Sequence, residues 1–390
     1  MSAAEMDVLF QPLQIGDVTI PNRIGMAAMA RNRSNAGNVP SELMKKYYLQ
    51  RALGGAGLIV SEAVFTSPHG PRSDRMPGIW TLEQVMAWKR ITNAVHLARS
   101  KMYCQLWHMG RLSDPDAQGN IFAPSPIRAV GGEHCFQYLT GAMDFSTPRE
   151  IPNPRVFVNQ FKTAAIHAKA AGFDGVELHA CSGFLVHQFL DSKSNIRTDE
   201  WGGSPQNRAR FPLEVLQALV EVFGNNVGVK ISPCGGFNDM GMPLQETIET
   251  FGYFVREADK LGLAYISLMR YDARKDPIIN GQRRGTPHDL LATYLSHISP
   301  TSKMKVFVVG DVVPAEAAAL VQDPESRVDG VFFGVPWVAH PDLAKRIRHG
   351  KGLGNIVREA YFYDGADAND QAEAKEDLRV GYTDYVAVTY

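Results

Sequence analysis

Short apolar segments alternate with longer amphipathic segments along most of the chain. Eight of the short segments are apolar on both faces and are flanked by Gly or Pro, the pattern of parallel strands buried on both sides. We predict these strands at residues 24–29, 58–64, 102–107, 175–180, 227–233, 265–269, 305–310 and 328–334. Helices are predicted between them, most clearly at residues 81–99, 207–223, 243–261 and 288–298, where apolar residues recur at helical spacing.

Eight strands that alternate with helices over roughly 310 residues predict a (β/α)8 TIM barrel of the α/β class. We treat residues 1–390 as one domain. An open doubly wound sheet is the alternative, but no GxGxxG motif follows the first predicted strand. The Gly-rich run LGGAGLIV at 53–60 precedes a strand, so we interpret it as a helix C-terminus and a turn.

Two further segments modify this barrel. The N-terminal run LQIGDVTI has two alternating stretches around Gly16-Asp17, which is typical of a β-hairpin, and we predict that this hairpin caps the bottom of the barrel. Residues 108–155 follow the third strand and are rich in Gly, Pro and polar residues. Because a loop of this length in a compact domain is usually functional, we predict a lid over the site.

Composition narrows the class of protein. The net charge is −1 and no basic block stands out, which argues against nucleic-acid or anionic membrane partners. No apolar run reaches the roughly 18 residues of a membrane span, and the N-terminus lacks a signal-peptide pattern. The four cysteines lack CxxC spacing. We expect a cytoplasmic monomer or homodimer that acts on a small molecule.

Catalytic groups of a barrel lie at the carboxyl ends of its strands and in the loops that follow. The predicted strand ends present Ala28, Met29, Ala30, Arg31, Gln105, Trp107, His108, Arg111, His179, Ser182, Phe184, His187, Lys230, Ser232, Cys234, Met269, Arg270, Tyr271, Gly310, Asp311, Phe333 and Gly334. This set lacks a metal-ligand cluster and a carboxylate pair suited to glycoside hydrolysis. Its cations, amide and glycines fit a planar, anionic, phosphate-bearing ligand such as a flavin.

Each candidate also has a plain structural interpretation. His179 is compatible with a satisfied core histidine, and Gln105 with a buried structural amide. Lys230, inside the apolar run VGVKIS, needs a partner because burying an unpaired charge is costly. Cys181 lies beside Ser182 and His179, but no orienting acid is evident, so we interpret it as an inert buried thiol.

Five stretches carry a resemblance that covers nearly the whole chain: LFQPLQIGDVTIPNRI, QLWHMGR, FDGVELH, QFLDSKSNIRTDEWGGSPQNRARF and VFFGVPWVAHPDL. The chain resembles the Old Yellow Enzyme family of flavin-dependent ene-reductases, and the fourth stretch is the most specific. The resemblance implies FMN as cofactor, NAD(P)H as reductant and the activated alkene of an α,β-unsaturated carbonyl compound as substrate. It also implies the barrel that the alternation predicts independently.

The resemblance assigns roles to individual positions. His179 and Ser182 match the two donors that hold the substrate oxygen, and Gln105 matches the residue that contacts the flavin pyrimidine edge. Lys230 matches a cation near the flavin, and Gly310 and Gly334 match the phosphate site. The other cofactor positions are Met29, Ala30, Ala63, Asp311 and Phe333, and the other substrate positions are Trp107, Phe184, Phe237 and Tyr363.

The chain departs from the family pattern at five positions. Ser182 replaces a His or Asn, and Phe184 replaces the tyrosine that usually donates a proton. Ala30 replaces a hydroxyl residue near the flavin, and Val335 stands where the family has a phosphate-binding arginine. Ala63 replaces a glycine.

These departures shape the functional hypotheses. General acid catalysis contributes roughly 10²–10⁴ in rate, so we expect a non-standard proton-transfer step at Phe184, in a specialised secondary-metabolite pathway. Hydride that adds and then returns would give a net isomerisation, and desaturation or reduction with solvent protons are variants. The alternative is a redox-neutral isomerase or cyclase whose flavin is weakly bound or used without net turnover. A binding protein without chemistry is opposed by the retained His179, Gln105 and Lys230.

Overall fold

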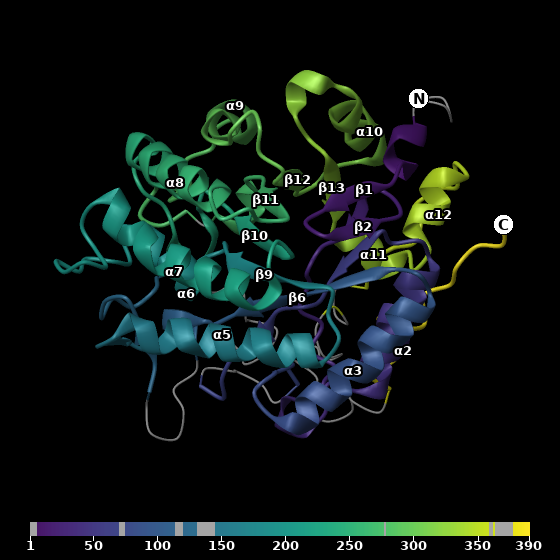
Figure 1. The fold of residues 1–390 in the computed structure, drawn as a ribbon, viewed down its shortest axis with the longest axis horizontal. Coiled ribbons are helices and arrows are strands. Elements are labelled where there is room, and N and C mark those ends of the chain that lie inside the picture. The colour runs from purple at the N-terminus through teal and green to yellow at the C-terminus, as the bar shows by residue number, and fades with distance from the viewer. Residues whose placement is uncertain are drawn as a thin grey trace.

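The computed structural model describes residues 6–69, 75–113, 120–130, 145–276, 278–358, 362 and 377–390. The described strands form a closed parallel barrel in the order β4-β3-β13-β12-β11-β10-β9-β6-β5, and a β4–β6 pairing closes the ring (Figure 1). The strands are β3 (Ile24–Met26), β4 (Leu58–Val60), β5 (Val64–Phe65), β6 (Lys101–Trp107), β9 (Gly175–Ala180), β10 (Val227–Ile231), β11 (Tyr265–Met269), β12 (Lys305–Val309) and β13 (Gly330–Phe333). The predicted (β/α)8 barrel is therefore confirmed.

The second predicted strand is split into two short strands. Both β4 and β5 pair with β6, while Ser61, Glu62 and Ala63 leave the ladder between them. Ser61 Oγ accepts a hydrogen bond from the backbone N–H of Gln105 at 3.0 Å, so a side chain replaces the missing strand partner. The sequence pattern does not reveal this break, because all three residues are as buried as a strand residue would be.

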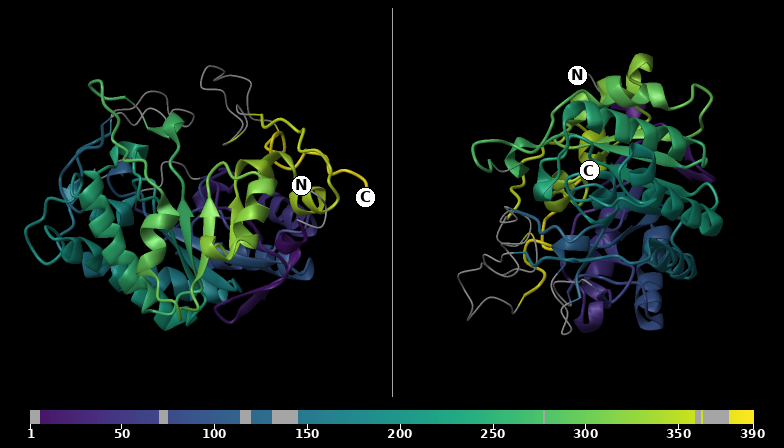
Figure 2. Two further views of the ribbon diagram at one scale, coloured as in Figure 1. Left: turned by 90° about the horizontal axis from the view of Figure 1, so that it is seen from above. Right: turned by 90° about the vertical axis from the view of Figure 1, so that its left-hand side faces the viewer.

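Helices surround the barrel on its outer side (Figures 1 and 2). The predicted helices at 81–99, 207–223 and 243–261 are confirmed, and the fourth is a short helix followed by the 3-10 turn η6 (Leu295–His297). Thr81 begins one helix with a capping box to Gln84, and Gly54 ends another, as the Gly-rich run predicts. The helices are α2 (Glu42–Leu53), α3 (Leu82–Leu97), α5 (Pro154–Ala170), α6 (Leu185–Leu190), α7 (Pro205–Phe223), α8 (Leu244–Asp259), α9 (Leu290–Tyr294), α10 (Pro314–Gln322), α11 (Val335–Ala339) and α12 (Leu343–Arg348).

The N-terminal hairpin fills the bottom of the barrel, as predicted. Strands β1 (Leu13–Ile15) and β2 (Val18–Ile20) pair antiparallel around Gly16, whose φ of +54° suits glycine. Their apolar side chains join one buried cluster with the interior rings Tyr103, Tyr265, Phe307 and Phe332. The backbone N–H of Asp17 donates to Asn226 Oδ1 at 2.8 Å, next to the start of β10.

The described part of the long segment after β6 covers the opposite end of the barrel. It contains the turn η3 (Gly110–Leu112) and a small two-stranded sheet of β7 (Phe122–Ala123) and β8 (Arg149–Glu150). Ala129 and Phe145 from this segment pack in one cluster with Phe65, Trp107 and Phe184. The segment thus builds an apolar wall beside the strand ends.

Residues 377–390 lie against α2 and the first barrel strand. Three buried arginines donate to backbone carbonyls of this segment: Arg31 to Gly381 at 2.7 Å, Arg33 to Leu378 at 3.1 Å and Arg51 to Tyr382 at 3.3 Å. The rings of Tyr47 and Tyr382 stack at 4.1 Å. The C-terminal segment is therefore tied to α2 and to the segment that follows β3.

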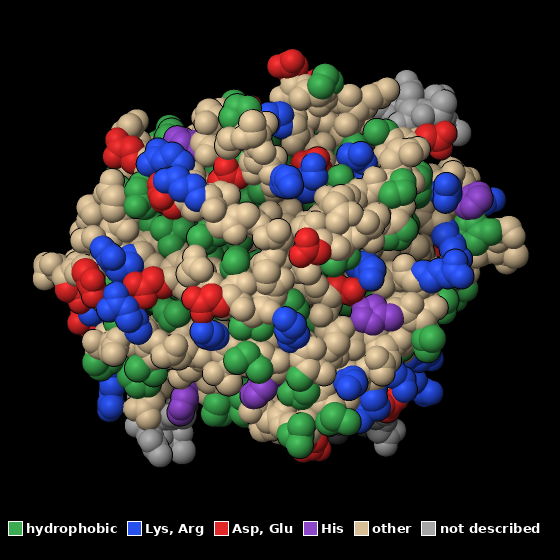
Figure 3. Space-filling view, viewed as in Figure 1, with side chains coloured by type: hydrophobic (Ala, Val, Ile, Leu, Met, Phe, Trp, Pro, Cys, Tyr) green, Lys and Arg blue, Asp and Glu red, His purple; other side chains and the backbone are tan. Residues whose placement is uncertain are grey.

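The surface seen in Figure 3 carries interspersed basic and acidic side chains, with scattered hydrophobic ones. In the part of the chain that the structure describes, no helix has the length and apolarity needed to cross a bilayer.

Candidate active site

Strand register brings the predicted site residues together at the carboxyl ends of β6, β9 and β10. Gln105 pairs with Glu177 across β6 and β9, and His179 pairs with Lys230 across β9 and β10. Because side chains alternate along a strand, Glu177 and His179 point to the same face. The site therefore has two levels: a polar layer with Glu177 and Gln105, and a level one step nearer the mouth with His179 and its register partner Lys230.

The polar layer is organised around the carboxylate of Glu177. Gln105 Nε2 donates to Glu177 Oε1 at 2.6 Å, and the Tyr265 hydroxyl donates to Oε2 at 2.9 Å. Burial raises the pKa of Glu177, and the positive charge of Lys230 and these hydrogen bonds oppose that rise. Sequence reasoning missed Glu177, although its spacing of two residues from His179 places it on the same face.

Lys230 lies half-buried on β10 beside His179, its register partner. Within the described residues, no hydrogen bond or ion pair joins its ammonium group to another side chain, and its charge acts on Glu177, His179 and Cys181. A cation held in this way is available to an anionic ligand.

His179 is a neutral hydrogen-bonding group. Its side chain is buried, and this burial, together with the nearby charge of Lys230, lowers its pKa to about 3. The ring stacks on Trp107 at 5.8 Å, which fixes its plane. A neutral imidazole has one N–H to donate, so His179 can hold an oxygen without carrying a charge of its own.

Ser182 lies in a sharp turn that ends β9 and leads into α6. Its φ is +55° and that of Gly183 is +79°. The backbone N–H of Ser182 donates to Ser232 Oγ at 2.9 Å, and its carbonyl accepts from Asn238 Nδ2 at 2.8 Å. Among the described residues, its hydroxyl donates only to sulfur atoms, those of Cys181 at 3.6 Å and Met269 at 3.7 Å, which are weak acceptors. The hydroxyl can therefore turn to a stronger acceptor on a ligand.

Phe184 contacts both His179 and Trp107. Its ring is edge-on to the imidazole at 4.8 Å and edge-on to the indole at 4.5 Å. The ring is buried in the apolar wall with Phe65 and Leu112. The indole N–H of Trp107 is also buried and has no hydrogen-bond partner among the described residues. This wall is apolar, and Phe184 offers it no acidic proton.

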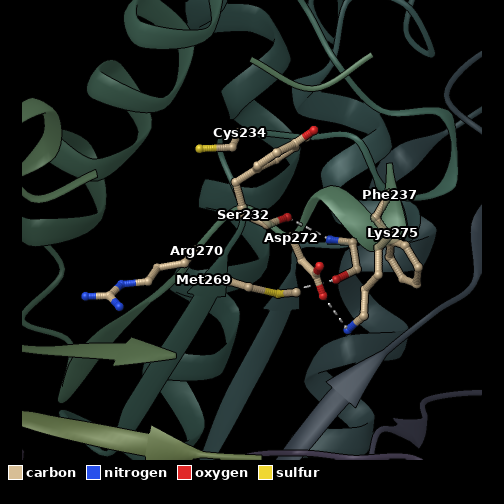
Figure 4. A pocket seen from close by; sticks show the side chains of 10 residues that line it. Ser232, Cys234, Phe237, Met269, Arg270, Asp272 and Lys275 are labelled. Atoms are coloured by element: carbon tan, nitrogen blue, oxygen red, sulfur yellow. Dashed lines mark hydrogen bonds and ion pairs between the residues drawn. The ribbon is translucent and has the colours of Figure 1, made fainter. Parts of the chain in front are cut away.

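A small hollow, partly open to solvent, lies beside Ser182 (Figure 4). Phe237, from the turn η4 (Phe237–Asp239), stands on one side with Lys275, whose Nζ lies 5.7 Å from the ring centre. Arg270 points to the other side, where it pairs with Glu316 at 2.6 Å. Phe237 therefore lines an opening next to the predicted donors, as expected.

The turn that carries Phe237 is fixed by one buried carboxylate, Asp239. Its oxygens lie 3.5 Å from Arg111 Nη2 and 3.0 Å from Arg284 Nη2, and Oδ2 accepts from the backbone N–H of Val130 at 3.1 Å. These partners belong to the segment after β6 and the segment after β11. Asp239 thus joins three segments at the mouth of the barrel.

The ends of β12 and β13 form a backbone cradle. Gly310 has φ +114°, and a Cβ there would lie 3.1 Å from Arg270 Cβ, so glycine is required. Gly334 precedes α11 beside Met29, and Asp311 pairs with Arg274 at the surface. Val335 is 53% exposed and carries no charge to this cradle.

The remaining candidates differ in what their side chains can reach. Ala63 lies in the apolar wall, and neither it nor Ala30 offers a hydrogen-bonding side chain. The Phe333 side chain packs in the outer core, so only its backbone faces the cradle. Tyr363 lies outside the described residues.

Several strand-end residues serve the fold instead of the site. His187 Nδ1 accepts from the backbone N–H of Gly183 at 3.1 Å, and Arg31 binds the C-terminal segment. Burial raises the pKa of the Cys181 thiol to about 11, which keeps it protonated. Among the described residues, no cluster of His, Cys, Asp and Glu could hold a metal ion.

Comparisons with known proteins agree with this geometry. A sequence profile of the NADH:flavin oxidoreductase / NADH oxidase family matches residues 8–353. The chain is 35% identical to chanoclavine-I aldehyde reductase of Penicillium roqueforti, over 97% of this chain and 96% of that protein. It is 32% identical to a probable inactive reductase of Epichloe festucae var. lolii, over 92% and 93%. The solved structure of morphinone reductase superposes with a TM-score of 0.83 at 36% identity, covering 97% and 96% of the two chains.

Proposed function

The chain belongs to the NADH:flavin oxidoreductase / NADH oxidase family, and within it we propose an enzyme that acts on the activated alkene of an α,β-unsaturated carbonyl compound through a non-standard proton-transfer step. As a family member it is a flavin oxidoreductase of the Old Yellow Enzyme type. FMN is its cofactor and a nicotinamide nucleotide its reductant. Morphinone reductase has been solved with tetrahydroNAD, which supports the second assignment.

The site fits FMN on its own chemistry. The unpaired ammonium of Lys230 would offset negative charge on the ring, and Gln105 would bind its pyrimidine edge. The cradle at Gly310 and Gly334 leaves room for a phosphate against backbone N–H groups. When bound there, FMN supplies the hydride chemistry of the family.

His179 and Ser182 would activate the substrate. One neutral N–H and one redirectable hydroxyl stand at the end of β9, next to the hollow lined by Phe237. Two such donors on a carbonyl oxygen stabilise the negative charge that develops there when a nucleophile adds at the β-carbon. Trp107 holds the imidazole plane, which keeps this geometry fixed.

The observation that carries the proton-transfer proposal is the packing of Phe184. Its ring touches both His179 and Trp107 and is buried in an apolar wall, so no side-chain proton is delivered from Phe184. An intermediate held by His179 would therefore live long enough for its bonds to rotate. Return of the hydride would then complete a net isomerisation.

A specialised pathway is supported by the relatives. One relative is named chanoclavine-I aldehyde reductase, and another is named a probable inactive reductase. Both are similar to this chain over more than nine-tenths of its length. We propose that this enzyme likewise acts on an enal or enone of secondary metabolism.

A redox-neutral isomerase or cyclase on the same barrel is the second candidate. It is favoured by Val335, which leaves the phosphate cradle without a side-chain cation, and by Ala30, which offers no hydrogen bond. In this case FMN would be weakly bound or would not turn over. The two candidates differ in whether the reaction requires reduced FMN.

The test is a comparison of wild type with Phe184→Tyr, using an enal that can isomerise and NADPH under anaerobic conditions. We expect wild type to consume far less than one NADPH per product and to form mainly isomer. The restored hydroxyl should raise saturated product by roughly 10²–10⁴. Phe237→Tyr is a matched control, since it adds the same hydroxyl on the other side of the hollow.

Two results would contradict the proposal. Wild type that forms saturated product with one NADPH per turnover, at the rate of Phe184→Tyr, would show that Phe184 does not limit proton transfer. Isomerisation that continues in protein stripped of FMN would favour the redox-neutral candidate.

A further inference from the structure

We propose that Glu177 is a positioning residue that determines which atoms Gln105 presents to FMN and sets the charge beneath the flavin ring. This inference rests on the proposed function and deepens it. It starts from the arrangement of Glu177, Gln105 and Tyr265, in which a buried carboxylate accepts two side-chain hydrogen bonds below the mouth of the barrel.

The orientation of the Gln105 amide follows from the carboxylate. An ionised carboxylate only accepts hydrogen bonds, so the Gln105 amide must turn its NH₂ group toward Glu177, as the 2.6 Å contact shows. The amide oxygen is then left for another donor. The opposite rotamer would place two acceptors against each other and is excluded while Glu177 is charged.

The carboxylate itself cannot move away. Tyr265 donates to its second oxygen at 2.9 Å, and the ring of Tyr265 is packed between Phe307 at 5.4 Å and Phe332 at 5.5 Å. Glu177 is 2% exposed, so no solvent competes for its oxygens. The aromatic floor of the barrel therefore fixes the carboxylate, which in turn fixes Gln105.

The orientation of the Gln105 amide determines which hydrogen bonds it can make to the cofactor. The pyrimidine edge of a flavin offers one N–H between two carbonyl groups, so its N–H needs an acceptor. Gln105 with its oxygen turned outward is such an acceptor, and its second N–H remains available for a neighbouring carbonyl. Glu177 thus prepares Gln105 before the cofactor arrives, which lowers the cost of binding.

Glu177 also balances the positive charge next to this layer. Its negative charge interacts with Lys230, which has no hydrogen bond or ion pair among the described residues. A flavin gains electron density when it is reduced. Loss of the Glu177 charge would therefore leave Lys230 uncompensated and favour the reduced form.

The experiment measures FMN affinity by fluorescence titration and the midpoint potential by equilibration with a redox dye. Glu177→Gln should weaken binding of oxidised FMN by about tenfold, the worth of one charged hydrogen bond, and shift the potential to a more positive value. Glu177→Asp keeps the charge but withdraws it from Gln105. It should weaken binding and leave the potential near that of wild type.

Tyr265→Phe is the matched control, because it removes the other hydrogen bond to the carboxylate and leaves Gln105 in place. Because Tyr265 only helps to hold the carboxylate and Phe keeps the ring packing, we expect a smaller loss of FMN affinity than in Glu177→Gln, within about threefold, and a potential close to that of wild type. If Tyr265→Phe and Glu177→Gln changed FMN affinity and midpoint potential equally, the inference would be overturned. The changes would then come from the floor of the barrel and not from Glu177 itself.

Unchanged affinity and potential in folded Glu177→Gln would also overturn it. If that variant does not fold, Glu177→Asp decides: wild-type affinity would contradict the positioning role. A wild-type protein that takes up no FMN would overturn the proposed function and this inference with it, whereas normal FMN uptake with unaffected variants would overturn the inference alone.

Discussion

Val335 is the residue at which the chain departs most directly from a phosphate-binding site. Its side chain is 53% exposed at the start of α11, next to the cradle glycine Gly334. A guanidinium at this position would lie beside backbone N–H groups without displacing buried atoms. The low charge of the cradle therefore comes from one surface side chain and can be reversed without changing the fold.

We predict that Val335→Arg tightens FMN binding by roughly 10–100-fold, the value of a hydrogen bond to a charged group. Riboflavin, which lacks the phosphate, should bind wild type and variant equally, and serves as the control ligand. Fluorescence titration with both ligands measures the two ratios. An equal gain for riboflavin would show that the arginine acts on the ring instead of the phosphate.

Glu62 is a second buried carboxyl whose environment has a measurable consequence. Burial raises its pKa to about 7, although the backbone N–H groups of Arg31 and Asn32 donate to it at 3.1 and 3.3 Å. Between the unfolded value of 4.5 and about 7, the folded state holds a proton that the unfolded state has released. Stability contributed by this group therefore falls as pH rises through that window.

We predict that Glu62→Gln, which cannot ionise, becomes more stable relative to wild type as pH rises. The difference in free energy of unfolding should change in favour of the variant by about 3 kcal/mol between pH 4.5 and 7.5. Urea titrations at several pH values in this range measure it. A difference that does not vary with pH would contradict the prediction.

Residue-level prediction reaches the candidates that lie within one strand or at its end. His179, Gln105 and Lys230 were predicted from their positions, and the register brings them together. Glu177 was missed because its role depends on Gln105, 72 positions earlier in the chain, and on Tyr265, 88 positions later. Strand alternation shows which face a residue occupies, but it does not identify the partner on a neighbouring strand.

At the scale of elements, the mouth of the barrel depends on how its connecting segments are tied together. Asp239 contacts Arg111, which is 1% exposed, and Arg284, and it also accepts from the backbone of Val130. The strands themselves were predictable from their apolar runs, and the break between β4 and β5 was not. The contacts of Asp239 and the break between β4 and β5 both depend on side chains that hydrogen-bond to backbone groups far along the chain. A local sequence pattern does not reveal such contacts.

We predict that Asp239→Asn lowers the free energy of unfolding by about 3–5 kcal/mol, because the buried guanidinium of Arg111 loses its counter-charge. Asp272→Asn is the matched control. Its partner Arg274 is 69% exposed, so its loss should cost less than about 1 kcal/mol. Urea unfolding of both variants measures the two costs, and equal costs would show that burial of Arg111 is not decisive.

At the scale of the whole molecule, residues 377–390 are bound to α2 and to the segment that follows the first barrel strand. Arg31, Arg33 and Arg51 donate to its backbone carbonyls, and Tyr47 stacks on Tyr382. We propose on this basis that the chain unfolds as one domain. No local pattern predicts these contacts, since they join residues more than 300 positions apart.

We predict that removing residues 377–390 lowers the free energy of unfolding by several kcal/mol, because three buried guanidinium groups lose acceptors. Full-length protein should unfold in a single transition by circular dichroism and by tryptophan fluorescence. Val386→Ala is the control, since this side chain is 76% exposed and its loss should cost less than about 0.5 kcal/mol. A truncated protein as stable as wild type would contradict the prediction.

The same segment determines when the barrel can be completed during synthesis. Arg31 leaves the ribosome 350 residues before Gly381, whose carbonyl it binds. At roughly 5–20 residues per second, the interval is roughly 20–70 s. Throughout that time the nascent chain carries cations that cannot yet be buried with their acceptors. The contacts of Arg31 can therefore be completed only after Gly381 has been synthesised, so the order of synthesis delays the final closure of this side of the barrel.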